Sequence, residues 1–367
     1  KPSWRDQLTD SRVMAMLAEK NGVRWFVARN GLNRVSNGVV QAIRSNDKFV
    51  SAFQDRSGGF WFAGDQGLLR QPIDWRLFKA YLPDAVNTPT LRNKTPTDYQ
   101  AQSDGSLLIV GSSGAIDRFW PKTGEVQHLN SQEPMLQLQN ISSVLVDQSG
   151  YIWIGADNGK EQSLIKFNAD LSTSQVWHQN SALDAGLLGP IKQIIQTQQG
   201  MIWVVYYGGG IQARDPLSGQ VLQSVTPASG QGLKYPDPEQ LFIGPDKALW
   251  LAGGEGLLRW NSQKNVFEAV LGAPQERIYS AHVAANDAVW IGRLGLLEQY
   301  HWNSQQLTLR QSVSGDDGLP AVDITGINHD NNAALWLTSS RGLMRYDAGT
   351  KRVHLYSINE GLRSQEL

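Results

Sequence analysis

Short apolar runs alternate with glycine-rich turns along the whole chain, and the alternation repeats with a nearly constant period. Residues 141–146 form one such run and residues 151–155 a second, with the turn Asp147–Gly150 between them. Two further runs, 164–168 and 175–178, complete the unit. Apolar and β-branched runs of this length, bounded by Asp, Asn and Gly, are typical of strands joined by tight turns. The pattern therefore predicts four short antiparallel strands in this unit.

A tryptophan on the second predicted strand marks almost every unit. In the clearest copy a turn glycine, Gly150, lies three residues before Trp153, and Gly159 lies six residues after it. Leu108 replaces the tryptophan in one unit, and the eight positions, which we call the anchors, are 36, 47, 45, 50, 47, 40 and 46 residues apart. Repeats of about 40–50 residues with one such aromatic each are typical of propeller blades. The tryptophan anchors are Trp25, Trp61, Trp153, Trp203, Trp250, Trp290 and Trp336.

The repeat predicts an all-β fold, a β-propeller of four-stranded antiparallel blades built from eight repeat units. We expect residues 1–367 to form one propeller domain with eight blades. A seven-bladed ring, with the eighth unit belonging to a neighbour, is the alternative. Each tryptophan anchor is expected to fill the wedge between neighbouring sheets, where burial of a ring stabilises the fold by roughly 3 kcal/mol. The anchors are therefore interpreted as structural residues and not as ligand contacts.

Composition excludes several classes of protein. The 33 basic and 34 acidic side chains are in balance and form no basic stripe, so nucleic acid is not an expected partner. There is no cysteine, which excludes disulfides, thiol catalysis and cysteine-ligated metals. No apolar run approaches the roughly 18–20 residues of a membrane-spanning helix. Because residues 360–362 resemble the lead-in to another first strand, we expect the chain to be a fragment of a larger protein.

The repeat resembles the two-component regulator propeller repeat, in which an apolar strand is followed by Asp-x-x-Gly, Ile-Trp-Ile-Gly, a Gly-Leu turn and an Arg-Tyr-Asp strand. Segments 147–159 and 330–347 carry the resemblance most fully, and it extends from about Val13 to Leu367. The resemblance implies a periplasmic, non-catalytic, ligand-sensing module of a membrane-bound bacterial receptor. It also implies a histidine kinase or diguanylate cyclase output domain, which this sequence lacks, and a homodimer or a second propeller as partner.

One face of the predicted propeller is expected to bind the ligand. The turn between the second and third strands of a blade lies on the same face as the linker into the first strand, over the central channel. These turns carry charges of both signs, and a Tyr-Tyr-Gly-Gly-Gly segment offers two rings and an open backbone, which suits a small molecule or an oligosaccharide. Polar side chains are equally what a solvated turn carries, and that is the competing interpretation. The predicted ligand-binding residues are Tyr206, Tyr207, Arg29, Asp65, Asp157, Arg293, Arg341 and His282.

Catalytic residues are not predicted. The six histidines show no metal-ligand spacing, and the chain has neither a nucleophile elbow nor a phosphate-binding loop. His282, expected on a first strand facing the channel, is the candidate base if the protein is an enzyme. We expect no cofactor and no metal. A propeller lyase or glycoside-processing enzyme is the first alternative function, and a protein-interaction platform with a broad apolar patch is the second.

Overall fold

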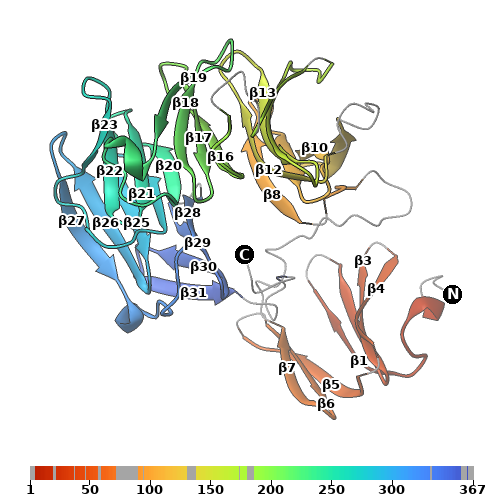
Figure 1. Cartoon of the computed structure of the whole chain (residues 1–367). Helices are drawn as coiled ribbons and strands as arrows, with labels where there is room; N and C mark the ends of the chain where they lie inside the picture. The colour runs from red at the N-terminus through yellow and green to blue at the C-terminus, as the bar shows by residue number, and fades with distance from the viewer. Residues whose placement is uncertain are drawn as a thin grey trace. The chain divides into compact units, whose positions relative to one another are not determined.

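Small antiparallel sheets make up the fold (Figure 1). The computed structural model of the chain describes residues 5–19, 22–36, 38–45, 47–56, 59–71, 90–93, 95–129, 138–172, 174–179, 186–330, 333–356 and 362. Within these ranges the strands form seven four-stranded sheets and one three-stranded sheet, and no α-helix is present. The predicted fold class, an all-β protein of eight propeller blades, is therefore confirmed.

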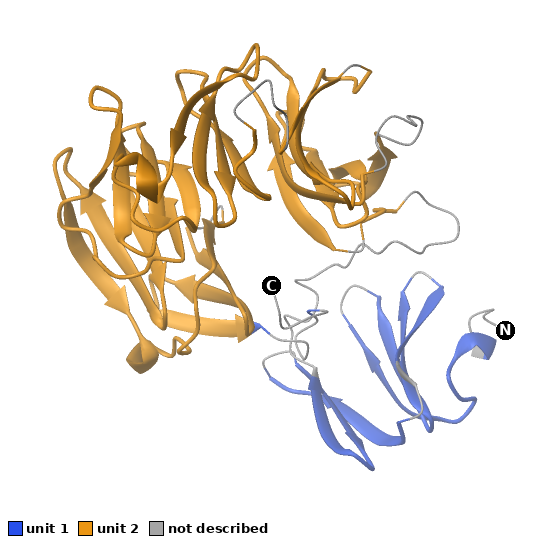
Figure 2. Ribbon diagram, viewed as in Figure 1, with its two compact units in different colours: residues 1–79, 356–365 blue, residues 80–355, 366–367 orange. Residues whose placement is uncertain are grey.

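The chain divides into two compact units (Figure 2). The first comprises residues 1–79 and 356–365, and the second comprises residues 80–355 and 366–367. The expectation that all 367 residues form one domain, and that eight blades close one ring, stays a prediction. Strands of the first unit are β1 Val13–Ala18, β2 Arg24–Ala28, β3 Gly31–Ser36 and β4 Val39–Ser45 in one blade, and β5 Phe49–Gln54, β6 Phe60–Gly64 and β7 Gly67–Gln71 in the next.

The second unit holds six four-stranded blades, each with its strands in sequence order. Short 3-10 turns flank the blades of both units at Arg5–Gln7, Pro227–Ser229 and Gly315–Asp317. The six blades are β8 Pro96–Ala101, β9 Leu107–Gly111, β10 Ile116–Trp120 and β11 Glu125–His128; β12 Asn140–Val146, β13 Ile152–Asp157, β14 Gln162–Phe167 and β15 Ser174–His178; β16 Ile191–Gln196, β17 Ile202–Tyr206, β18 Gly210–Arg214 and β19 Val221–Val225; β20 Gln240–Ile243, β21 Leu249–Gly253, β22 Gly256–Asn261 and β23 Val266–Ala269; β24 Ser280–Val283, β25 Ala288–Arg293, β26 Leu296–Trp302 and β27 Leu307–Val313; and β28 Gly326–His329, β29 Leu335–Ser339, β30 Gly342–Asp347 and β31 Arg352–Tyr356.

First strands of successive blades lie side by side in the second unit, so the first strand of each blade is the inner one. An inner strand is also the edge of its sheet. The backbone N–H and C=O groups on the side away from its own sheet therefore need other hydrogen-bond partners. Glutamine side chains supply them across the blade boundary. The Gln193 amide accepts from Leu241 N and donates to Leu241 O, both at 2.9 Å. Gln100 makes the same pair of bonds with Val146.

Most anchors are buried between blades. Trp153 lies in one apolar cluster with Leu187, Ile191 and Ile194, which belong to the following blade and its linker. Leu108, which replaces tryptophan in its unit, is also buried, whereas Trp61 and Trp336 are partly exposed. The buried anchors thus connect a blade to the next one within the same compact unit through the hydrophobic core.

A carboxylate at the end of the first strand binds the indole of five anchors. Asp147, read from the sequence as a turn residue, accepts from Ser149 N at 2.9 Å and Tyr151 N at 3.0 Å, and its second oxygen binds the anchor indole. One residue therefore closes the turn and orients the ring. The pairs are Trp25 with Glu19 at 2.7 Å, Trp61 with Asp55 at 2.8 Å, Trp153 with Asp147 at 2.8 Å, Trp250 with Asp246 at 2.9 Å and Trp336 with Asp330 at 3.2 Å.

Candidate functional site

Charged side chains from three successive blades meet at one end of the second unit. This end, which we call the linker end, carries the turns between second and third strands and the linkers into the next first strand. Lys192 of β16 lies 3.2 Å from Glu239, measured from Nζ to Oε2, and Glu239 directly precedes β20. Arg277, which precedes β24, donates from Nε to the other Glu239 oxygen at 2.9 Å. One carboxylate therefore joins two cations across blade boundaries.

Two tyrosine rings lie beside these cations. Lys192 Nζ is 5.4 Å from the ring centroid of Tyr207, and Arg277 Cζ is 5.3 Å from that of Tyr279. Both distances are within the range of cation–π attraction. Tyr207 is 53% exposed, so its ring remains accessible to a ligand. The linker end therefore combines an open aromatic face with fixed charged groups.

Electrostatics keep the central carboxylate ionised. Burial disfavours the charged form of Glu239, but the hydrogen bond from Arg277 and the charge of Lys192 outweigh it and lower the pKa of Glu239 below its ordinary value. Asp237 lies 3.7 Å from Lys192 Nζ, measured from Oδ1. Two cations and two carboxylates thus nearly cancel, and the site offers many donors and acceptors with little net charge.

The structure places Tyr206 differently from the prediction. Its ring is wholly buried, and its hydroxyl donates to Gln212 Oε1 at 2.6 Å. Arg214 Nη2 donates to the same oxygen at 2.8 Å, and burial raises the pKa of Tyr206 to about 12. The expectation that this ring offers a stacking face is therefore wrong. Consecutive residues at a strand end point to opposite sides, so only Tyr207 of the pair reaches the surface.

The three glycines after this tyrosine pair are needed by the backbone itself. Gly208 and Gly210 have φ values of 64° and 91°, in the left-handed region. A Cβ added to Gly209 would lie 2.5 Å from the carbonyl oxygen of Leu188. The close approach that we expected from a ligand is therefore made by the chain's own linker.

The remaining predicted ligand-binding residues are distributed over both units. In the first unit Arg29 is exposed, and Asp65 lines a pocket of about 350 Å³ with Lys48 and Gln66. In the second unit Asp157 uses its carboxylate on its own turn, accepting from Gly159 N at 2.5 Å and from Gln162 Nε2 at 2.9 Å.

Two predicted arginines lie in the last two blades. Arg293 is ion-paired with Glu298 at 3.2 Å, from Nη1 to Oε2, and also with the exposed Glu276. Arg341 is exposed on its turn. Arg293 therefore pairs with two acids at the linker end.

Sequence analysis missed Lys192, Glu239, Arg277 and Tyr279. We predicted that the linkers into the first strands would share the ligand face, but apart from His282 on a first strand the predicted residues all came from the turns. Each of these four residues lies at, or just before, the start of an inner strand. Comparing the residues at the start of each first strand from repeat to repeat would have identified charged and aromatic side chains in three successive blades.

A histidine pair joins two inner strands. His282 Nε2 lies 2.7 Å from His329 Nδ1, and the two residues belong to β24 and β28. Burial and the neighbouring His329 both lower the pKa of His282. Sequence spacing could not reveal this pair because 47 residues separate its members. Within the described ranges no group of three or more potential ligands is placed to hold a metal.

The histidine pair predicts a pH-dependent stability. Because the pKa of His282 is lowered in the folded protein, the unfolded chain binds its proton first as the pH falls. We expect its contribution to be full above pH 6.5 and to be lost progressively below it. His282→Gln should flatten the decline in Tm between pH 7.5 and 5.5, and His329→Gln should do the same. An unchanged pH profile in both variants would contradict this role.

Comparisons with known proteins find two distant relatives in sequence and several similar folds among solved structures. No protein-family model matches the chain. Histidine kinase P4 of Formosa agariphila is 24% identical over 288 residues, which are 72% of this chain and 20% of that protein. The outer membrane protein assembly factor BamB of Yersinia pestis is 25% identical over 227 residues, which are 60% of this chain and 54% of that protein. The chain thus spans between a fifth and about half of these relatives.

Solved structures share the fold at low sequence identity. The extracellular domain of BT4673 from B. thetaiotaomicron, assigned to a hybrid two component system, matches with a TM-score of 0.58 and 18% identity, covering 95% of this chain and 48% of that one. The β-propeller domain of Swd1 from Myceliophteria thermophila matches with a TM-score of 0.53 and 10% identity, covering 74% of this chain and 88% of that one. The predicted resemblance to receptor propellers therefore holds at the level of the fold.

Proposed function

We propose that the chain is a ligand-sensing propeller module of a bacterial signal-transduction receptor, located in the periplasm and without catalytic activity of its own. The observation that carries this proposal is the likeness of 95% of the chain to the extracellular domain of BT4673. The match to a histidine kinase, of which the chain spans only 20%, agrees with a sensor belonging to a longer receptor. Among the described residues no helix is long and apolar enough to cross a membrane.

The linker end of the second unit is the proposed ligand site. Tyr207 offers an accessible ring, while Lys192, Glu239 and Arg277 offer fixed donors and acceptors. Aromatic faces stack on the C–H faces of ring compounds, and convergent polar groups fix the orientation of a ligand. Because the charges nearly cancel, a neutral polyhydroxylated ligand such as an oligosaccharide fits better than a strongly charged one.

A binding screen tests this proposal. Thermal unfolding of the chain is followed with oligosaccharides, sugar acids and peptides, and each hit is measured by calorimetry. A ligand at 100 times its Kd should add about 2.7 kcal/mol of stability. Chromatography of the incubated ligand is expected to show no product, and conversion of the ligand would overturn the non-catalytic part of the proposal.

The site itself is tested with a matched pair of variants. Tyr207→Ala should weaken binding about tenfold, equivalent to about 1.4 kcal/mol, because the accessible ring is lost. Tyr151 is the control, since it is also exposed beside a lysine, Lys166 Nζ lying 4.0 Å from its ring centroid, but it lies at the opposite end of its blade. Tyr151→Ala should leave the affinity unchanged. Equal losses in the two variants would remove the linker end as the site.

Signal transmission is proposed to use the partners implied by the resemblance. A second propeller of the same receptor, or a second copy of it, would change its arrangement when ligand binds, because the strands of a blade have little freedom of their own. Small-angle scattering of the complete periplasmic region, with and without a ligand from the screen, measures this change.

A further inference from the structure

One blade departs from the repeat at the end opposite to the linker end. In the blade β16–β19, Thr197 directly follows the first strand, at the position where four other blades place the indole-binding acid; in a fifth blade the acid, Asp246, lies two residues further along. The residue facing the anchor on the third strand is also different. Six of the eight anchors face an arginine or a lysine there, whereas Trp203 faces Ala213. Both charged partners of the anchor are therefore absent from this blade.

These substitutions leave the anchor indole without a carboxylate partner. Trp203 as a whole is only 2% exposed. Its Nε1 is not among the buried side-chain atoms that lack a partner in the described part of the chain, so this N–H keeps access to solvent and can donate to a ligand. The Thr197 backbone N–H and hydroxyl both bond to Met201 O, at 3.0 and 3.4 Å, and this hydroxyl does not take the place of the missing carboxylate.

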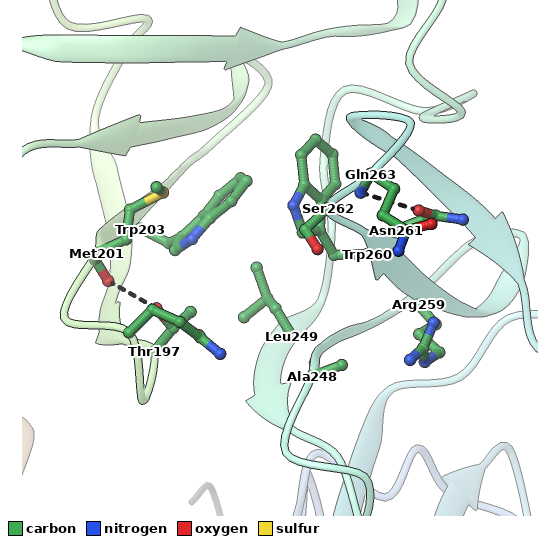
Figure 3. Close-up of a pocket in the computed structure, with 11 residues that line it drawn as sticks. Thr197, Met201, Trp203, Ala248, Leu249, Arg259, Trp260, Asn261, Ser262 and Gln263 are labelled. Atoms are coloured by element: carbon green, nitrogen blue, oxygen red, sulfur yellow. Dashed lines mark hydrogen bonds between the residues drawn. The ribbon is translucent and has the colours of Figure 1, made fainter. Parts of the chain in front are cut away.

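A pocket of about 460 Å³ lies beside this indole (Figure 3). Its apolar walls are Trp203, Trp260, Leu249 and Met201, and the two indole rings meet edge to face with centroids 5.0 Å apart. The volume falls within the range of small-molecule sites in proteins. The blade β24–β27 also lacks the acid, because Ala284 occupies this position before Trp290. The pocket beside the indole is what distinguishes the Trp203 position.

A cation from the following blade completes the lining. Arg259 borders the pocket, and its Nε binds Asp246. Its two terminal nitrogens have no hydrogen-bond partner among the described residues and can donate to a further anion. Arginine presents paired N–H groups whose geometry matches that of a carboxylate. The pocket therefore has a free indole donor, free guanidinium donors and apolar walls.

We propose that this pocket, the Trp203 pocket, binds a small organic carboxylate with an apolar body. The ligand carboxylate accepts from Trp203 Nε1–H, as the carboxylates of Asp147 and Asp246 do for their own anchors. Its apolar body packs on Trp260, Leu249 and Met201, and Arg259 supplies the compensating charge. The ligand thus completes the acid–indole–cation arrangement that five other blades build from protein residues. The site is separate from the proposed ligand site at the linker end.

Indole NMR signals test the proposal directly, with benzoate as the probe. The ¹⁵N-labelled chain gives Nε1–H resonances from its 13 tryptophans, and Trp203→Phe identifies the one from Trp203. Benzoate should shift this resonance saturably, at least tenfold more tightly than benzamide, which has the same ring without the charge. No shift of the Trp203 resonance, or equal affinities for benzoate and benzamide, would overturn the proposal.

Restoring the acid of the repeat provides the matched variants. Thr197→Asp should occupy the indole N–H internally and weaken benzoate binding at least tenfold, while Thr197→Val, of the same size as threonine, should leave it unchanged. Unaltered benzoate affinity in folded Thr197→Asp would refute the proposal. Arg259→Met keeps the apolar stem, loses the charge and should also weaken benzoate binding at least tenfold. If Thr197→Asp does not fold, an unchanged affinity in Arg259→Met is the refuting result.

Discussion

Replacing Trp153 by alanine should lower the free energy of unfolding by about 3–5 kcal/mol. The ring is 0% exposed and packs on apolar residues of the next blade, including Leu187 and Ile194. Its removal leaves a cavity between two sheets and takes the indole donor from Asp147, which binds it at 2.8 Å. Urea unfolding followed by circular dichroism measures the loss.

Trp336→Ala is the matched control for this prediction. Trp336 is an anchor in another blade of the second compact unit. Its indole also donates to an acid, Asp330, at 3.2 Å, but the ring is partly exposed. Less apolar surface is lost and no closed cavity forms, so we expect a loss of about 1–2 kcal/mol. Equal losses at the two positions would show that burial between blades is not what the anchor contributes.

Glu239→Gln should have the second largest effect, lowering the free energy of unfolding at neutral pH by about 1–3 kcal/mol. The Glu239 side chain is 16% exposed, and its loss of charge leaves Lys192 and Arg277 beside each other without their shared counter-charge. The expected value lies between those of fully exposed and fully buried ion pairs. Urea unfolding at pH 7 measures it.

The same variant should change the acid limb of the stability profile. The folded protein lowers the pKa of Glu239, so its contribution is full above the ordinary value near 4.5 and is lost as the pH falls through the folded value. Glu239→Gln should therefore lose less stability than the natural protein between pH 5 and 3. Glu268→Gln is the control, because Glu268 pairs at 2.8 Å with Lys264 on the exposed surface and should matter little at pH 7. A larger loss of unfolding free energy at pH 7 in Glu268→Gln than in Glu239→Gln would contradict the stabilising role given to Glu239.

Much of the fold could be predicted because its information is local. The repeat that contains Trp153 was expected to have strands at 141–146, 151–155, 164–168 and 175–178, and these correspond within two residues to strands β12 to β15. Apolar alternation and turn residues act within a few positions, and the recurring tryptophan then gives the period. Sheet order follows because tight turns allow only neighbouring strands to pair.

The candidate site could be predicted only in part because its contacts cross blade boundaries. The Glu239 carboxylate reaches residues 47 positions earlier and 38 positions later, and no local pattern encodes these distances. Tyr206 was mispredicted for a different reason. Side chains alternate between the two faces of a strand, and continuing this alternation to the end of the strand would have placed the Tyr206 ring in the core. The Thr197 and Ala213 departures are visible in the sequence, but their meaning depends on knowing which side chains face Trp203.

The glutamine bridges between inner strands bear on how such a chain can evolve. Gln193 and Gln100 recognise only the peptide groups of the neighbouring blade, at Leu241 and Val146. A peptide group is the same whatever side chain the neighbour carries, so the joint places no demand on the neighbour's identity. At these two boundaries the hydrogen-bonded joint is therefore preserved when the side chains of the neighbouring strand change. The loops of a blade can then vary in sequence while this joint is kept, and only the apolar packing of the anchors still depends on the neighbour's side chains.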